Sequence, residues 1–218
     1  MMTKVAVILS GCGVFDGCEV HESTFVLLAL DQAGVEYECL APNINQMHVI
    51  NHLTGQEEDT QRNVLVESAR IARGKVLDLV DAVPGDYSAV IVPGGFGVAK
   101  NLCDFALKGA GMSVNEQVQI FIQAIHNAGH PVGLACISPV MSKNLFGDGV
   151  LCTIGNDEET AAAIVEMGAT HQNCAVDDIV IDEKNKLVTT PAYMLADRIK
   201  DVHTGITKMV VAVLEMLK

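Results

Sequence analysis

The chain has 218 residues, of which 50% are hydrophobic and 4% aromatic, and its formal net charge at pH 7 is −13. This length favours one domain, 1–218, with a core large enough to fold without disulfides. The acidic excess argues against a nucleic-acid partner and against an anionic membrane surface, because both require a basic footprint.

The first part of the chain alternates strand-like and helix-like segments. The hydrophobic patterns predict a buried strand over 4–10, a helix over 22–34 and a strand over 35–42. A polar, irregular loop is expected over 43–60, and helical periodicity runs over 61–80.

The second part continues this alternation and ends in a long helix. The predicted elements are strands at 87–95, 130–139 and 149–155, helices at 114–129 and 156–169, a hairpin at 177–190, and a helix at 192–217 that could break near Gly205. Alternating elements with nearly continuous apolar strands predict an α/β fold with a doubly wound, mostly parallel sheet. In such sheets, sites form where strands end and helices begin.

The cysteines point to a reducing compartment. Seven are present, an odd number, with no CxxC pair and no zinc-ligand spacing. The apolar run at the start is too short for a signal peptide, and no run of 18 or more apolar residues follows. We therefore expect a cytoplasmic protein with reduced thiols and no metal site.

The first strand ends in the glycine-rich stretch "VILSGCGVFDGCEVHE" (7–22). A dinucleotide-binding G-x-G-x-x-G motif would need glycine at position 16, where the chain has Asp16, so the spacing is wrong and an anion occupies the phosphate position. Two interpretations remain. The glycines either form a simple connecting turn or bring Glu22, at the start of the first helix, to a site.

Cys136 in "VGLACISP" lies where a buried strand turns into a helix, between small neighbours. A nucleophile elbow has this pattern, because the turn is strained and the side chain must project. The free N–H groups of a helix start would favour the thiolate and lower the thiol pKa. The alternative is a buried structural cysteine.

"VPGGFG" (92–97) follows another buried strand. The N–H groups of Gly94 and Gly95, together with that of Ile137, could hold an oxyanion, although an ordinary tight turn would give the same sequence. Next to Glu22, His21 could serve as an auxiliary base, or it could be a solvated loop histidine.

Several stretches together resemble one superfamily along nearly the whole chain. They are 7–22, "VINHLTG" (49–55), "ARIARGK" (69–75), "IVPGGFGVAKNL" (91–102), "CISP" (136–139), "TIG" (153–155) and "VDDIVIDEKNKLVTTPAYMLA" (176–196). The sequence resembles the class I glutamine amidotransferase-like superfamily, and within it the isoprenoid-biosynthesis glyoxalases. The resemblance implies a flavodoxin-like three-layer sandwich, Cys136 as nucleophile, and Glu22 as the carboxyl that hydrogen-bonds the cysteine.

One departure from the superfamily affects the expected reaction. Amidotransferases of this superfamily carry a histidine after the strand that follows the elbow, where this chain has Ile154. A thiol and a carboxyl without histidine suit the conversion of glyoxal to glycolate, with no metal, cofactor or glutathione. Two alternatives stay open: a redox-sensing or partner-binding protein with an oxidisable Cys136, and an amidase or glutaminase using His21. The resemblance also implies a homodimer.

Overall fold

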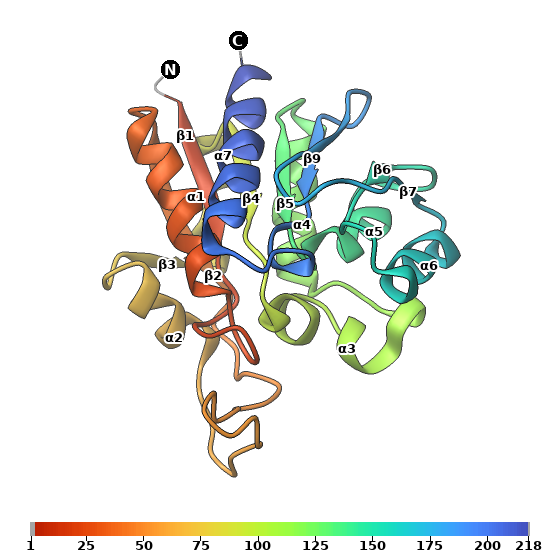
Figure 1. Cartoon of the computed structure of the whole chain (residues 1–218). Coiled ribbons are helices and arrows are strands. Elements are labelled where there is room, and N and C mark those ends of the chain that lie inside the picture. Colours follow the sequence, from red (N-terminus) through yellow and green to blue (C-terminus); the bar gives the residue numbers. More distant parts are fainter. Residues whose placement is uncertain (1–2, 218) are drawn as a thin grey trace.

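Runs of buried aliphatic residues form the centre of the sheet. The computed structural model describes residues 3–217, and its central strands are β1 (Lys4–Ile8), β4 (Ala89–Val92) and β5 (Val132–Ala135). Nearly every side chain in them is buried. These strands read as continuous apolar runs because helices cover both faces of the sheet (Figure 1).

The seven-stranded sheet has the order β3-β2-β1-β4-β5-β9-β8. The outer strands are β2 (Glu36–Ala41), β3 (Val76–Asp78), β9 (Leu187–Thr190) and β8 (Val180–Asp182). All neighbours are parallel except β8 and β9, which form the predicted hairpin. From β1 the chain builds outward to β2 and β3 and then returns to add β4 on the other side of β1. The loops that follow β1 and β4 therefore start next to each other at the carboxyl ends of the strands.

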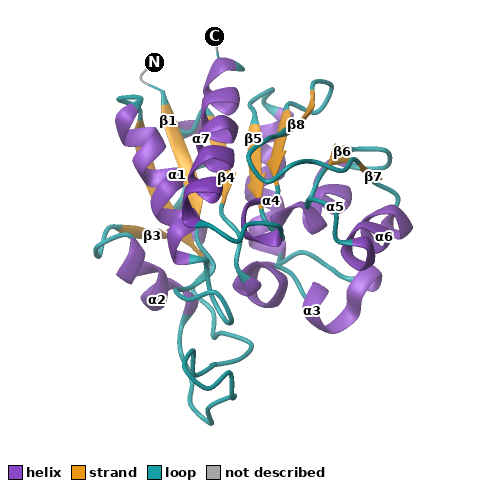
Figure 2. Ribbon diagram, in the orientation of Figure 1, coloured by secondary structure: helices purple, strands orange, loops and turns teal. Residues whose placement is uncertain are grey.

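Helices form the outer layers. On one face, α1 (Val20–Gln32) packs against α7 (Ile199–Glu215), and α4 (Glu116–Asn127) covers the other face (Figure 2). The shorter elements are α2 (Val64–Ile71), α3 (Phe105–Lys108), α5 (Ser142–Phe146), α6 (Glu158–Met167), and the strands β6 (Leu151–Cys152) and β7 (Thr170–His171). The fold class is therefore the α/β three-layer arrangement predicted from the sequence.

Two predicted elements are wrong. The helix predicted over 61–80 ends at Ile71, because Arg73 and Gly74 adopt φ values of 53° and 82° and reverse the chain. The following residues form β3, which pairs with β2. The strand predicted at 149–155 is reduced to β6, which pairs with β7 in a separate two-stranded sheet.

The last helix begins later than predicted and does not break at Gly205. It runs without interruption from Ile199, and Gly205 lies against a neighbouring loop. A Cβ on this glycine would lie 2.6 Å from the carbonyl oxygen of Val176 and 2.8 Å from Oγ1 of Thr190. The glycine therefore permits close packing of α7 on the end of β9.

Within residues 3–217, no helix combines the length and the apolar character needed to cross a lipid bilayer.

Candidate active site

Glycines join the loop after β1 to the loop after β4, backbone against backbone. Gly97 N–H donates to the Gly17 carbonyl at 2.9 Å, and Glu19 N–H donates to the Gly94 carbonyl at 3.0 Å. A Cβ on Gly97 would lie 2.5 Å from the Cα of Gly17, and one on Gly95 would collide with the backbone of Glu19. The first loop is thus held tightly against the second as it enters α1, and this contact sets the position of Glu22.

Glu22 lies in the first turn of α1 and is fully buried. Its Oε2 accepts from Gly94 N–H at 2.8 Å, and its Oε1 accepts from Tyr193 N–H at 3.1 Å. Burial raises the pKa of Glu22 to about 7, while hydrogen bonds from Tyr193, Cys136 and Gly94 limit the rise. The carboxyl therefore exchanges its proton near neutral pH.

Cys136 occupies the sharp bend after β5 that the sequence predicts. Its φ of 60° lies in the left-handed region, which non-glycine residues rarely adopt and which is typical of a strained elbow. The bend is held by Cys136 N–H, which donates to the Thr190 carbonyl at 2.9 Å. The side chain is 6% exposed and lies at the floor of a cleft.

The expectation of a resting thiolate is wrong. Burial, and then the charge of Glu22, raise the pKa of Cys136 well above its ordinary value. The N–H groups of Gly95 and Ile137 act in the opposite direction, but they do not outweigh burial. The segment after the elbow begins as a 3₁₀ turn, Ser138–Met141, and continues directly into α5. The cysteine therefore rests as a thiol, close to the Glu22 carboxyl.

Gly94 leaves the space in which these two side chains meet. A Cβ at this position would lie 2.6 Å from Glu22 Oε2 and 2.8 Å from Cys136 Sγ. Its N–H is directed at the carboxyl, whereas the N–H groups of Gly95 and Ile137 are directed at the sulfur. Oxyanion binding by the N–H groups of Gly94, Gly95 and Ile137 stays a prediction. The N–H of Gly94 already donates to Glu22 in this structure.

The cleft above Cys136 has a volume of about 780 Å³. Sequence reasoning missed the side chains that form its walls, which are the rings of Phe15, Phe96, Phe105 and Tyr193 and the amine of Lys100. The only signal for two of them was a phenylalanine beside the glycines in each glycine-rich loop. The lining residues include no histidine in the part of the chain that the structure describes.

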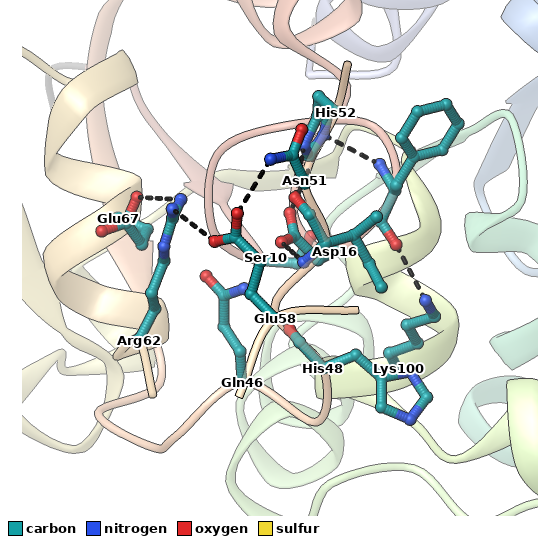
Figure 3. Close-up of polar contacts among 12 residues, drawn as sticks. Ser10, Asp16, Gln46, His48, Asn51, His52, Glu58, Arg62, Glu67 and Lys100 are labelled. Atoms are coloured by element: carbon teal, nitrogen blue, oxygen red, sulfur yellow. Dashed lines mark hydrogen bonds and ion pairs between the residues drawn. The ribbon is translucent and has the colours of Figure 1, made fainter. Parts of the chain in front are cut away.

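An excursion loop, residues 43–63, forms one rim of the cleft and extends away from the sheet (Figure 1). Buried Asp16 anchors it by accepting from Ile50 N–H at 2.7 Å, and His52 Nε2 accepts from Phe15 N–H at 3.2 Å. Lys100 Nζ donates to the Phe15 carbonyl at 2.8 Å (Figure 3). Asp16 is therefore a structural residue of the glycine-rich loop, and the loop orients the Phe15 ring.

His21 does not line the cleft. It is exposed on α1, and its Nδ1 lies 2.8 Å from the hydroxyl of Tyr193 and 3.8 Å from Glu19 Oε1. Among residues 3–217, no group of three or more His, Cys, Asp or Glu side chains could hold a metal ion.

Comparison with known proteins identifies the family. No protein-family model matches the chain. The human protein named glutamine amidotransferase-like class 1 domain-containing protein 3, mitochondrial, is 45% identical over 98% of this chain and 83% of its own length. The chain belongs to the glutamine amidotransferase-like class 1 family. The ES1 protein, mitochondrial, of Danio rerio is 31% identical over 88% of this chain and 77% of its own length.

Solved structures agree with this family assignment. An isoprenoid biosynthesis protein with an amidotransferase-like domain, from Ehrlichia chaffeensis, has a TM-score of 0.92 and 36% identity over 99% of this chain and all of that one. Glyoxalase III from Candida albicans has a TM-score of 0.62 at 15% identity over 97% of each chain, which shows a shared fold. The resemblance to the class I glutamine amidotransferase-like superfamily is confirmed.

The expected cytoplasmic location is wrong by the same comparisons. The curated relatives from human, rat and zebrafish are all named as mitochondrial proteins. The cysteine pattern indicates only that the protein works in a reducing environment. It does not tell one reducing compartment from another.

Proposed function

We propose that this protein is a glyoxalase-like enzyme that converts the small dicarbonyl glyoxal to glycolate without cofactor or glutathione. The observation that carries the proposal is the placement of the Cys136 sulfur and the buried Glu22 carboxyl on either side of Gly94, at the floor of an open cleft. A general base works best when its pKa lies near the working pH, and the pKa of Glu22 is about 7.

The first step forms a carbon–sulfur bond. Glu22 takes the thiol proton as the Cys136 sulfur attacks one aldehyde carbon, so a thiolate does not need to exist beforehand. The carbonyl oxygen becomes an alkoxide, which the N–H groups of Gly95 and Ile137 stabilise. The proton then passes from Glu22 to this oxygen and gives a neutral hemithioacetal.

The second step moves hydrogen between adjacent carbons. Glu22, again a carboxylate, removes the proton from the carbon bonded to sulfur, and the electron pair forms an enediol with the neighbouring carbonyl. A proton delivered to the second carbon leaves a hydroxyacetyl thioester on Cys136. Water then cleaves the carbon–sulfur bond, releases glycolate and restores the thiol, with no net oxidation or reduction.

The test is glycolate production from glyoxal, measured by chromatography without added thiol or metal. We expect Cys136→Ser and Glu22→Gln to lose at least about 100-fold in kcat/KM. Cys174→Ser, a cysteine outside the cleft, is the matched control and should keep wild-type activity. Full glyoxal turnover by Cys136→Ser would rule out the proposal.

The alternatives have less support from the site. Redox-sensing cysteines have low thiol pKa values and are accessible, whereas Cys136 is buried and its pKa is raised. The amidase alternative uses His21 as its base, and His21 does not line the cleft but contacts the hydroxyl of Tyr193. Homodimer formation, implied by the resemblance, stays a prediction that light scattering can test.

A further inference from the structure

Aromatic side chains are concentrated around Cys136. The chain has six Phe, three Tyr and no Trp, and four of these rings line this one cleft. Phe96 is 50% exposed and Phe15 is 39% exposed, although burying either ring would stabilise the fold. Partly exposed apolar groups that gather at a concave site are typical of a surface that binds a ligand.

The size of the cleft also exceeds what glyoxal needs. Pockets of about 300–1,000 Å³ enclose drug-sized ligands, and this cleft measures about 780 Å³. Glyoxal, with four heavy atoms, would contact Cys136 and its neighbours and leave the ring-lined walls empty. The walls therefore fit a substrate with a large apolar part beyond its reacting aldehyde.

The charges around the cleft favour a neutral apolar part. Lys100 is the one cation among the described lining residues, and its amine is engaged with the Phe15 carbonyl and lies 5.9 Å from the centre of the Phe96 ring. The acidic residues Glu19 and Asp157 lie on the same walls. An anionic tail would meet these carboxylates, whereas an uncharged aromatic ring can stack on the phenylalanines.

We propose that the cleft recognises 2-oxoaldehydes that carry an aryl group, an inference that rests on the proposed function and specifies its substrate class. In such a compound, Cys136 adds to the aldehyde carbon and the ketone carbon carries the aryl group. The same proton transfer gives a 2-hydroxyacyl thioester, and water releases the 2-hydroxy acid. Phenylglyoxal, the probe, would thus give mandelate, which is phenylglyoxal plus one water.

The experiment compares kcat/KM for phenylglyoxal with that for glyoxal in variants of the intact protein. We expect Phe96→Ala and Phe105→Ala each to lower the phenylglyoxal-to-glyoxal ratio at least about fivefold, because each removes one wall of the aryl site. Leu107→Ala is the matched control. Leu107 lies on α3 like Phe105, is 66% exposed and does not line the cleft, so the ratio should not change. Phenylglyoxal also reacts with arginine side chains, so the loss of phenylglyoxal in the Cys136→Ser variant measures this background and is subtracted.

Each result has a defined meaning. A ratio that is the same in Phe96→Ala, Phe105→Ala and wild type overturns the aryl inference and leaves the glyoxalase proposal standing. If the wild type converts neither aldehyde, the glyoxalase proposal fails, and binding of unreactive acetophenone, followed by saturation-transfer NMR, tests the cleft separately. Binding that Phe96→Ala weakens would support an aryl site, and absence of binding would overturn it.

Discussion

Replacing Glu22 with glutamine should make folding less sensitive to pH. Burial raises the pKa of this carboxyl from 4.5 to about 7, so the folded protein holds the proton more tightly than the unfolded chain does. Its contribution to the free energy of unfolding is therefore fully present below about pH 4.5 and is lost as the pH rises through about 7. The difference between the two pKa values corresponds to about 3 kcal/mol.

The glutamine side chain of the Glu22→Gln variant cannot titrate, but it also fits the site less well. Both oxygens of Glu22 accept backbone hydrogen bonds, from Gly94 and Tyr193, and an amide nitrogen cannot accept either of them. One buried N–H then lacks a partner, at a cost of about 1–3 kcal/mol that does not depend on pH. The variant should be less stable than wild type at pH 5, and the difference should shrink by about 2.5 kcal/mol between pH 5 and pH 8.

Urea unfolding at several pH values between 5 and 8 measures this difference. Far-UV circular dichroism is the suitable signal, because the chain has no Trp. Other titrating groups are present in both proteins, so their effects cancel in the comparison. A stability difference that stays constant within about 0.5 kcal/mol over this range would refute the assignment of the neutral-pH titration to Glu22.

Three further predictions concern the glycines and the thiol. Gly94→Ala should lower glyoxal turnover at least about 100-fold, because the added methyl group would collide with the side chains of Glu22 and Cys136. Gly85→Ala is the control and should leave turnover unchanged, because there is open space around Gly85. Gly205→Ala should lower the melting temperature. Alanine stabilises a helix by about 1 kcal/mol relative to glycine, but the added methyl group overpacks the contact with Val176 and Thr190, which costs about 1–3 kcal/mol. A higher melting temperature would contradict this close packing. Iodoacetamide at pH 8 should alkylate Cys136 faster in Glu22→Gln than in wild type, because the Glu22 carboxyl raises the pKa of the thiol. Mass spectrometry of the peptides measures the two rates, and equal rates would argue against contact between Glu22 and Cys136.

The fold class predicted from the sequence is confirmed, and the two residues predicted to meet, Cys136 and Glu22, lie close together, while their catalytic roles stay a prediction. Continuous apolar strands are a strong signal, and a cysteine between a buried strand and a turn is specific enough to indicate an elbow at Cys136. The helix predicted over 61–80 failed because two consecutive residues, Arg73 and Gly74, adopt positive φ values. A local pattern of apolar residues does not show this reversal, although the glycine is a recognised stop signal.

The protonation state of Cys136 could not be predicted because it depends on tertiary packing. The sequence indicated a favourable helix start, which lowers a thiol pKa, but the burial of the sulfur and its closeness to Glu22 come from segments more than a hundred residues apart. The aromatic walls were missed for the same reason. Phe15, Phe96 and Tyr193 converge only when three strand ends meet.

The glycine contact between the loops after β1 and β4 has a consequence for altering this protein. Since Gly17, Gly95 and Gly97 meet through their main chains, any side chain there would push the acid away from the thiol. Attempts to alter the proposed aldehyde specificity should therefore randomise the phenylalanine positions that line the cleft and leave these glycines unchanged.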